Sequence, residues 1–317
     1  MTYEYTRYPT QEQESLKLTS GVDILSIMQQ RSRQEIDRAF AYCKALARSH
    51  YENFPVASLV IPRERRPYVA AIYAFARTAD DFADEGDVPA HERLRRLEEW
   101  GEKLRRCYQG DATEPVFVAL GETAARTGLP REPLDALLHA FRMDVTTRRF
   151  ERFEDVLHYC RHSANPIGFL LLHLFGEATE RAVPLSDSIC TGLQLANFWQ
   201  DLSVDWAKGR LYVPLEDLDR FGYTEDELAR GVLDERFRRM LAFEVERARQ
   251  YLLDGVPLLD LVSSARLRFE LSLTVRGGMA ILKAVRAIGY DVLHRRPSLS
   301  AMDKADILLR TLLRRAP

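Results

Sequence analysis

The chain has few cysteines and no long apolar run. Its 317 residues include four cysteines, all far apart: Cys43, Cys107, Cys160 and Cys190. No Cys-x-x-Cys pair occurs, which argues against a zinc site or a redox motif, and separate thiols fit a reducing cytoplasm. The longest apolar run, residues 166–175, is interrupted by His173 and is too short to cross a membrane. The polar N-terminus lacks the apolar segment of a secretory signal. We therefore expect a cytoplasmic protein, with any membrane contact confined to peripheral association at the inner face.

An excess of charge of one sign is also lacking. Lys and Arg total 45 against 47 Asp and Glu, a net charge of −2, and basic residues form no long runs. We therefore expect no nucleic-acid partner. Alternating strand patterns are scarce, β-hairpin dipeptides between such runs are absent, and no fixed-period repeat occurs. No glycine-rich dinucleotide fingerprint appears either, so we expect no nicotinamide cofactor.

What the chain does contain is a succession of amphipathic helical patterns. Ser32-x-x-Glu35 is a capping box that opens a stretch with Ile36, Phe40 and Cys43 on one side. Similar patterns predict helices over residues 68–83, 91–108, 131–150, 153–175 and 185–205. A second capping box, Thr224-x-x-Glu227, leads into helices across 225–254, and 258–289 is expected to be one long helix or a helix pair. We predict an all-α protein with one domain over residues 31–317. Residues 1–30 are expected to be an N-terminal arm, either poorly ordered or forming a short extra helix.

The first chemically informative segment is acidic and reads Arg77-Thr-Ala-Asp80-Asp81-Phe-Ala-Asp84-Glu85. Asp80 and Asp84 are four residues apart and share a helix face, where like charges repel. The following Gly86-Asp87-Val-Pro89 predicts a helix end, and negative charge there opposes the helix dipole. A solvated helix end is the alternative reading of this segment alone. For Arg77 two interpretations stand side by side, a contact with diphosphate and a pairing with Asp80 and Asp81.

A second polar stripe follows a third of the chain later, at Gln194-x-x-Asn197-x-x-x-Asp201-x-x-x-Asp205. These residues share one face of a predicted helix. Their neighbours are apolar, and charges near a core need a partner. Clustered carboxylate and amide oxygens suit hard cations, with Mg²⁺ the usual choice beside a phosphate. We predict that the two faces lie opposite each other and hold more than one Mg²⁺, with these candidate ligands: Asp80, Asp81, Asp84, Asn197, Asp201 and Asp205.

Several other residues have two readings. Lys208 and Arg210 follow the second stripe and fit a diphosphate contact. Gln194 either binds substrate or satisfies backbone groups as an ordinary buried amide. Tyr159 either orients a proton transfer and stabilises a cation through its ring, or is a core tyrosine. Gly277-Gly278 lies within a predicted helix, where glycine costs stability. Either helices pack closely there, or the gap admits a long apolar ligand.

These residues give the chain a family resemblance over roughly residues 36–310. It resembles the squalene/phytoene synthases, the head-to-head prenyl synthases. The likeness rests on Asp80-Asp81-x-x-Asp84, on Tyr159-Cys160, and on the second stripe followed by Gly209-Arg210-Leu-Tyr212-x-Pro214. The resemblance implies an all-α isoprenoid synthase fold around a central cavity. It also implies a prenyl diphosphate as the lipid substrate and Mg²⁺ bound to that diphosphate.

Within the family, the chain is most similar to the bacterial hydroxysqualene synthases of hopanoid biosynthesis. The likeness lies in residues 53–58, 163–166 and 197–201. It implies conversion of presqualene diphosphate and water to hydroxysqualene and diphosphate, by ionisation, rearrangement and quenching of the cation with water. Acidic residues Asp80, Asp84, Asp201 and Asp205 would then be catalytic, with Tyr159 and Asn165 near the cation. The implied substrate-binding residues are His50, Asn53, Arg77, Gln194, Lys208, Arg210, Tyr212 and Arg296.

The departures from the broader family pattern bear on the substrate. Condensing members usually carry a Lys or Arg within the segment matching Tyr51-Glu52-Asn53-Phe54, and an arginine where this chain has Gln200. Two diphosphates need more positive charge than one, so these losses favour a single-diphosphate substrate. The alternatives are a condensing synthase that makes presqualene diphosphate, dehydrosqualene or phytoene, and a non-catalytic assembly or binding protein with the same fold. The oligomeric state is left open by the sequence.

Overall fold

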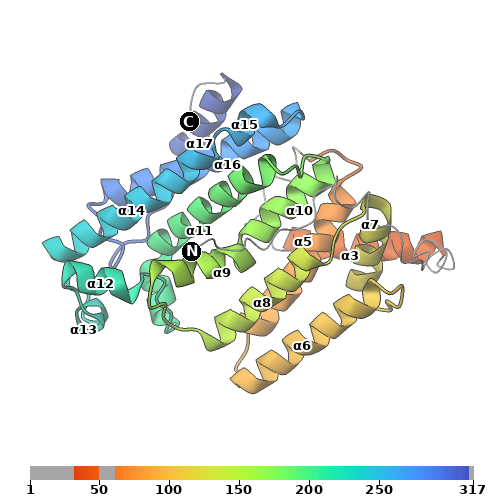
Figure 1. The fold of residues 1–317 in the computed structure, drawn as a ribbon, viewed down its shortest axis with the longest axis horizontal. Helices are drawn as coiled ribbons and strands as arrows, with labels where there is room; N and C mark the ends of the chain where they lie inside the picture. The colour runs from red at the N-terminus through yellow and green to blue at the C-terminus, as the bar shows by residue number, and fades with distance from the viewer. Residues whose placement is uncertain (1–31, 50–60, 314–317) are drawn as a thin grey trace. The chain divides into compact units, whose positions relative to one another are not determined.

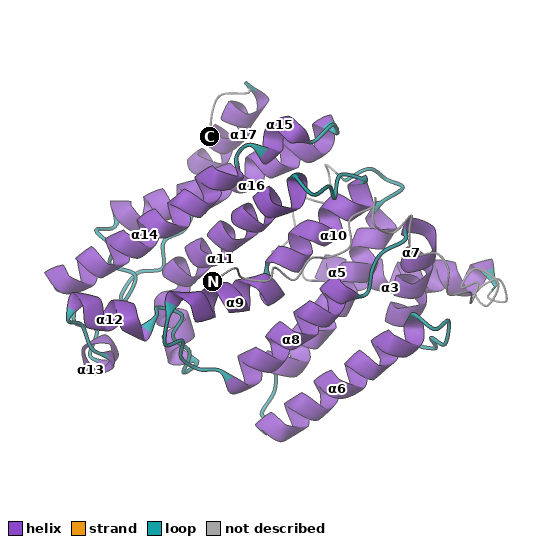
Figure 2. Ribbon diagram, viewed as in Figure 1, coloured by secondary structure: helices purple, strands orange, loops and turns teal. Residues whose placement is uncertain are grey.

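The computed structural model describes residues 32–49 and 61–313. Helices joined by short loops make up this part of the chain, and no strand occurs in it (Figures 1 and 2). The predicted all-α class is thereby confirmed. None of the helices within 32–49 and 61–313 is long and apolar enough to cross a membrane. The N-terminal arm and two predicted substrate-binding residues, His50 and Asn53, lie outside the described residues.

The helices group into two compact units. In its described part, the first unit comprises residues 32–49, 61–146 and 169–180. Its helices are α3 (Arg33–Ser49), α5 (Arg66–Asp84), α6 (Ala90–Cys107), α7 (Pro115–Thr127) and α8 (Glu132–Thr146). Phe75, Trp100 and Phe117 form its aromatic centre, with the Trp100 and Phe117 ring centroids 4.4 Å apart. The Ser32–Glu35 capping box and the apolar face of α3 are present as predicted.

The second unit comprises residues 147–168 and 181–313 of the described chain. Its helices are α9 (Phe153–Ser163), α11 (Ala182–Ala207), α12 (Leu215–Phe221), α13 (Glu225–Ala229), α14 (Glu235–Gly255), α15 (Leu258–Leu261), α16 (Ala265–Ala287) and α17 (Ala301–Leu312). Helix α10 (Asn165–Phe175) gives its first four residues to this unit and the remainder to the first. Helix α11, which carries the second polar stripe, packs against α9, α14, α15 and α16.

Glycines let α11, α14 and α16 pack closely. A Cβ on Gly278 of α16 would lie 2.8 Å from the Leu193 side chain, and one on Gly192 of α11 would lie 2.9 Å from the Leu252 backbone nitrogen. These separations are shorter than normal carbon contacts, so no side chain fits without displacing a neighbour. By contrast, a Cβ on Gly277 would meet nothing within 4 Å. Of the two explanations for the glycine pair, close packing holds at Gly278, and open space adjoins Gly277.

Helix boundaries differ from the prediction where proline or a turn intervenes. The stretch 153–175 is two helices, because Pro166 has no N–H and disfavours a helical conformation in the preceding residue. The stretch 258–289, predicted as one long helix or a helix pair, is a pair, the short α15 followed by the long α16. The predicted helix over 131–150 ends at Thr146. Helices α7, α12 and α17 were not predicted.

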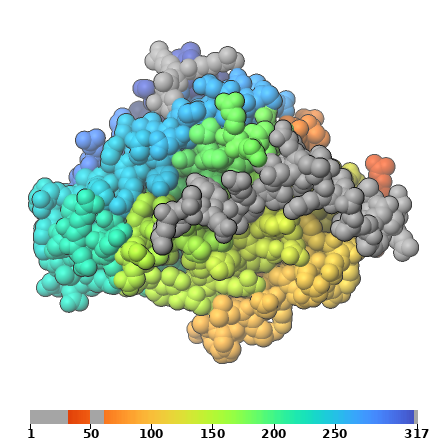
Figure 3. Space-filling view, in the orientation of Figure 1, coloured from red at the N-terminus to blue at the C-terminus, as the bar shows by residue number. Residues whose placement is uncertain are grey.

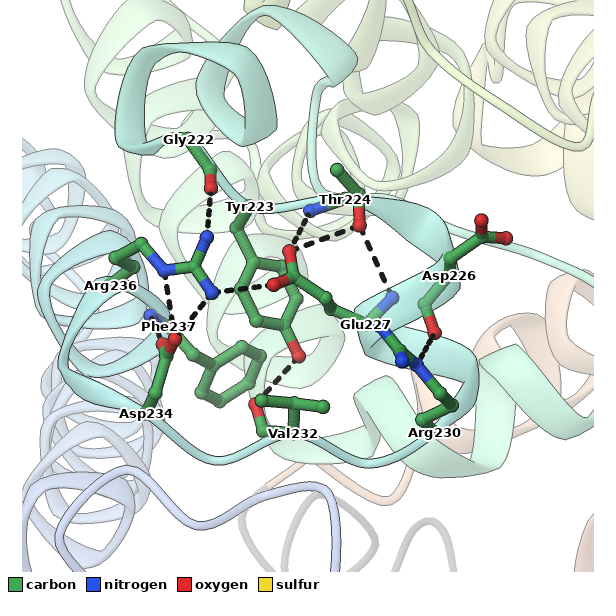
Figure 4. Close-up of polar contacts among 10 residues, drawn as sticks. All are labelled: Gly222, Tyr223, Thr224, Asp226, Glu227, Arg230, Val232, Asp234, Arg236 and Phe237. Carbon is green, nitrogen blue, oxygen red and sulfur yellow. Dashed lines mark hydrogen bonds and ion pairs between the residues drawn. The ribbon is translucent and has the colours of Figure 1, made fainter.

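A polar framework fixes the turns between α12, α13 and α14 (Figure 4). Arg236 donates to the Gly222 carbonyl oxygen at 2.6 Å and to Asp234 at 2.8 Å, and it also pairs with Glu227. Thr224 and Glu227 form the second predicted capping box, at the start of α13. Because a single guanidinium joins three segments, this end of the second unit is held by charge-assisted hydrogen bonds rather than by apolar packing alone.

Buried ionisable groups join α12 to α14. Arg247 lies 2.8 Å from the Asp217 carboxylate and 3.2 Å from that of Glu244, and both acids are buried. Burial raises the pKa of Glu244 well above its ordinary value, and Asp217 adds to the effect against the opposing charge of Arg247. One cation between two carboxylates leaves one negative charge in excess, and a proton retained on Glu244 removes that excess.

Candidate active site

The first acidic face lies on the last two turns of α5, with Arg77 at its centre. The Arg77 guanidinium lies 3.1 Å from Asp80, 2.6 Å from Asp81 and 2.6 Å from Glu85. Arg77 therefore pairs with the acids, which is one of the two interpretations of the sequence. A contact between Arg77 and diphosphate stays a prediction. Glu85, the third partner, was not predicted.

A second arginine stabilises the end of this helix. Helix α5 ends at Asp84, and Gly86 has φ +77°, a left-handed conformation that glycine adopts without strain. Arg93 of α6 donates to the carbonyl oxygens of Gly86 at 2.7 Å and of Val88 at 2.9 Å, and also to that of Ala83. Positive charge at a helix C-terminus is favourable. Arg93 thus offsets the unfavourable placement of carboxylates at this helix end.

Tyr73 extends the same face by one further turn, four residues before Arg77. Burial raises the pKa of Tyr73, the Arg77 charge lowers it, and the carboxylates of Asp80 and Asp81 raise it further. The phenol therefore stays protonated and can donate a hydrogen bond at neutral pH. The four-residue spacing from Arg77 is the sequence signal that identifies Tyr73, and the sequence analysis did not use it.

The second polar face lies on α11. Its polar positions are exposed or half-buried, while the residues between them are buried: Leu195, Ala196, Phe198, Trp199 and Leu202. Asn197 is exposed, and Gln194, Asp201 and Asp205 are half-buried. The predicted helical face is therefore present, with its apolar side in the core of the second unit. The two acidic faces belong to different units, and their facing each other stays a prediction.

The Asp201 carboxylate forms a bidentate ion pair with Arg296. The Arg296 Nε lies 2.6 Å from one carboxylate oxygen and its Nη2 lies 3.1 Å from the other, and this pairing raises the pKa of Arg296. The adjacent Gln200 side chain donates to the Pro297 carbonyl oxygen at 2.7 Å. Two neighbouring side chains of α11 therefore hold the segment that carries Arg296. The sequence had assigned Asp201 to metal and Arg296 to diphosphate, and it had not predicted that they pair.

Arg149 stabilises the C-terminal end of α11. Gly209, with φ +77°, turns the chain, and its carbonyl oxygen accepts from Arg149 at 2.8 Å. The same guanidinium lies 4.9 Å from the centre of the Trp206 ring and 2.7 Å from the Glu225 carboxylate. Lys208 is exposed and Arg210 is half-buried beside this turn. The two predicted diphosphate contacts thus follow a firmly positioned helix end.

Three buried aromatic side chains surround Tyr159: Phe150, Phe198 and Tyr212. Tyr212 stacks on Phe198 with ring centroids 3.8 Å apart, and Tyr159 lies 5.7 Å from Tyr212 and 5.8 Å from Phe150. Tyr159 is buried, as expected of a core tyrosine. Its aromatic neighbours also give this region the electron-rich ring faces that stabilise cations. Phe150 and Phe198 were missed, because a single aromatic residue in an apolar sequence carries no signal of its own.

Asn165 is 5% exposed at the start of α10, and its amide oxygen accepts a hydrogen bond from the Thr191 hydroxyl at 3.0 Å. This hydrogen bond fixes the orientation of the Asn165 amide against α11, with the amide oxygen as the acceptor. Thr191 was not identified from the sequence, since it is 26 residues away and no short spacing rule connects the two.

The chemistry of these donors fits Mg²⁺. Each acidic face offers carboxylate oxygens at helical spacing, and the α11 face adds the amide oxygen of Asn197. Exposed or half-buried ligands on rigid helices leave room for the water molecules that Mg²⁺ usually retains. The residues that would hold the ions are Asp80, Asp81 and Asp84 on α5, and Asn197, Asp201 and Asp205 on α11.

Comparison with known proteins places the chain in a family. The squalene/phytoene synthase family model matches residues 47–303. A hydroxysqualene synthase from Rhodopseudomonas palustris is 38% identical over 223 residues, covering 70% of this chain and 75% of that protein. A 15-cis-phytoene synthase from Synechocystis is 30% identical over 276 residues, covering 82% of this chain and 80% of that protein.

Solved structures agree with this assignment. A squalene synthase from Alicyclobacillus acidocaldarius has 41% sequence identity and a TM-score of 0.78, and the match covers 84% of this chain and 99% of that one. The range matched by the family model, residues 47–303, includes both acidic segments and the helices from α5 to α16. The chain belongs to the squalene/phytoene synthase family.

Proposed function

We propose that this chain is a hydroxysqualene synthase, which converts presqualene diphosphate and water to hydroxysqualene and diphosphate. Members of its family are enzymes that act on prenyl diphosphates. The identities of 41% to a squalene synthase and 38% to a hydroxysqualene synthase support the squalene branch, against 30% to a phytoene synthase.

The observation that carries the proposal is Gln200. Condensing members usually have arginine at this position, beside the second acidic face. Here the side chain is neutral, and its amide donates to the Pro297 carbonyl oxygen. A substrate with one diphosphate needs fewer cations than two substrates with one each. In the segment where condensing members usually have a Lys or Arg, this chain has the acidic Glu52 and the neutral Asn53. This difference also favours a substrate with a single diphosphate.

Bound Mg²⁺ would neutralise the diphosphate and stabilise its departure as a leaving group. The ligands would come from both acidic faces, with Arg77, Lys208, Arg210 and Arg296 supplying further positive charge. Arg296 is held on Asp201 by two contacts, so its guanidinium is already oriented beside the carboxylate that we assign to metal.

The remaining residues act on the hydrocarbon part. Ionisation breaks the carbon–oxygen bond to diphosphate and leaves a cyclopropylcarbinyl cation, which rearranges with opening of its ring. The ring faces of Tyr159 and Tyr212 stabilise that positive charge, and the buried aromatic cluster keeps bulk water away. Asn165 holds the quenching water. The oxygen of that water then bonds to the cation and its extra proton passes to the released diphosphate, which yields hydroxysqualene.

A condensing synthase is the second candidate. The 30% identity to a phytoene synthase over 82% of this chain favours it, as do the two complete acidic faces, which condensing enzymes share. The same complete faces argue against a non-catalytic binding protein. Product identity separates the two enzymes.

The test is incubation of the purified protein with presqualene diphosphate and Mg²⁺ in the absence of nicotinamide, followed by mass analysis of the lipid extract. We expect a C30 alcohol that incorporates ¹⁸O from labelled water. Consumption of farnesyl or geranylgeranyl diphosphate, with no conversion of presqualene diphosphate, would assign the chain to the condensing enzymes.

A further inference from the structure

Helix α9 carries two histidines on the side opposite its buried residues. His158 is exposed and His162, four residues later, is half-buried. Val156, Tyr159 and Cys160 form the buried side of the same helix. Residues of this part of the chain, drawn in yellow-green, reach the surface in the space-filling view (Figure 3). Side chains at this spacing lie one above the other on a helix. The pair is therefore reached from solvent and stands on a different helix from either acidic face.

The two imidazole rings are close enough to share one metal ion. Their centroids are 4.5 Å apart with 50° between the ring planes, and a ligand nitrogen of one ring lies within 4.8 Å of a ligand nitrogen of the other. Two nitrogens that bind one Zn²⁺ tetrahedrally, each about 2.0–2.1 Å from the ion, are roughly 3.4 Å apart. Small rotations of these side chains close the difference. The spacing His-x-x-x-His is also the one with which a helix presents two histidines to zinc.

A hydrogen bond selects the metal-binding nitrogen of His162. Its Nδ1 atom lies 2.8 Å from the His158 carbonyl oxygen, and because a carbonyl oxygen only accepts, Nδ1 carries the proton and donates it. In the neutral ring the lone pair is then on Nε2. Histidines that bind metals usually donate their other ring N–H to a carbonyl or carboxylate oxygen, which fixes the tautomer and orients the ring. His162 already has this arrangement.

The local charges favour a cation at this position. His162 stands in the last turn of α9, which ends at Ser163, and the C-terminal end of a helix carries partial negative charge. Arg161, the basic residue between the two histidines in sequence, pairs with Glu154 at 3.0 Å. The carboxylate of Glu154 offsets the positive charge of Arg161, so an ion at the histidine pair is not repelled by an uncompensated arginine of the same helix.

We propose that His158 and His162 bind a divalent transition-metal ion, and Zn²⁺ before others, through Nε2 of His162 and a ring nitrogen of His158, with water in the remaining positions. Imidazole suits Zn²⁺, Cu²⁺ and Ni²⁺, whereas Mg²⁺ takes oxygen ligands. The site therefore takes a different ion from the one that we assign to the acidic faces, and it does not depend on the proposed function. Because the ion joins two successive turns, it stabilises α9, whose buried side carries Tyr159.

The test is calorimetric titration of Zn²⁺ into the full chain, purified without a histidine tag, stripped of metal by a chelator and kept in excess Mg²⁺ to occupy oxygen ligands. The wild type should bind Zn²⁺, and His158→Asn, His162→Asn and the double variant should each bind it at least about tenfold more weakly. His91→Asn on α6 removes another exposed histidine and is the matched control, which should bind as the wild type does. Circular dichroism checks that each variant is folded.

A spectroscopic readout identifies the ligands. Cu²⁺ bound to the wild type should give an electron paramagnetic resonance spectrum with splitting from two imidazole nitrogens, and each single variant should show splitting from one. Absence of Zn²⁺ binding to the wild type would overturn the proposal. Undiminished binding to the double variant would overturn it as well, since the ion would then sit on other ligands, and so would equal weakening by His91→Asn. Because no substrate is present, none of these outcomes depends on whether the chain is a hydroxysqualene synthase.

Discussion

Two arginines pair with three of the acidic residues that we assign to metal, Asp80, Asp81 and Asp201. Arg77 contacts Asp80, Asp81 and Glu85 on α5, and Arg296 contacts Asp201 from 95 residues away. The first pairing follows from helical spacing, so the sequence predicts it as one of two readings. The second depends on the path of the chain after α16, which no spacing rule describes. Long-range partners of this kind are what sequence patterns leave out.

Asp201→Asn should abolish turnover without unfolding the protein. The amide keeps the shape of the carboxylate but loses its charge, and we expect turnover to fall by at least about 100-fold. The pair with the half-exposed Arg296 contributes at most about 1 kcal/mol to stability. Steady-state kinetics and thermal melting measure the two effects, with the exposed Asp219→Asn as control. Turnover close to that of the control would refute the metal role of Asp201.

Asp187 makes the stability of the protein depend on pH. Burial raises its pKa to about 7, and its Oδ1 atom is buried without a hydrogen-bond partner. The unfolded chain has the ordinary lower pKa, so it releases its proton first, and stability falls as the pH rises from about 4 to about 7. Asp187→Asn should raise the unfolding free energy at pH 8 by about 1–3 kcal/mol and flatten this slope.

Urea unfolding of wild type and Asp187→Asn at pH 5 and pH 8 checks this expectation. The two proteins should be nearly equal in stability at pH 5 and should separate at pH 8. The opposite trend, with the variant less stable at pH 8, would mean that the carboxylate has a partner that stabilises its charged form.

At the scale of helices, two glycines should respond in opposite ways to the same substitution. A Cβ on Gly255 of α14 would lie 2.7 Å from the Leu185 carbonyl oxygen, whereas one on Gly277 of α16 would meet nothing within 4 Å. Gly255→Ala should destabilise the protein by about 1–3 kcal/mol, because backbone must move. Gly277→Ala should stabilise it by about 1 kcal/mol, because alanine favours a helix. Chemical denaturation measures both, and destabilisation by both to a similar degree would contradict the packing described.

The helices that sequence patterns predicted are those with a long apolar face or a clear cap. Thr224-x-x-Glu227 and Ser32-x-x-Glu35 were found because their caps are local. Helix α17 was not predicted: its apolar face is exposed, and Thr311 is its one buried residue, so it adds little to the core. Helix α7 was missed because its residues are buried almost all round and show weak periodicity.

At the scale of the whole chain, the fold class and the family followed from the sequence, and the match over residues 47–303 agrees with both. The residues that make up each acidic face could also be predicted from the sequence, because each face is defined by residue spacing along one helix. The aromatic neighbours of Tyr159 and the Asn165–Thr191 contact did not, since they depend on how separate segments pack.

Removal of divalent metal should leave the folded protein intact. The carboxylates of Asp80, Asp81 and Asp201 have arginine partners within the chain. We expect a chelator to change the melting temperature by less than about 2 °C, and Mg²⁺ with inorganic diphosphate at 100 times Kd to stabilise the protein by about 2.7 kcal/mol. Differential scanning calorimetry checks both. Unfolding of the protein by the chelator would show that the arginines do not offset the repulsion among the carboxylates.

Arg77 and Arg296 act as built-in counter-ions, and this has a consequence for the life of the protein in the cell. On the metal assignment proposed above, a newly made chain would complete its fold before any divalent ion reaches it, and synthesis and turnover of the protein would not depend on magnesium supply. Magnesium scarcity would then silence the catalyst reversibly while its abundance stays constant, and activity would return with the ion and without new translation.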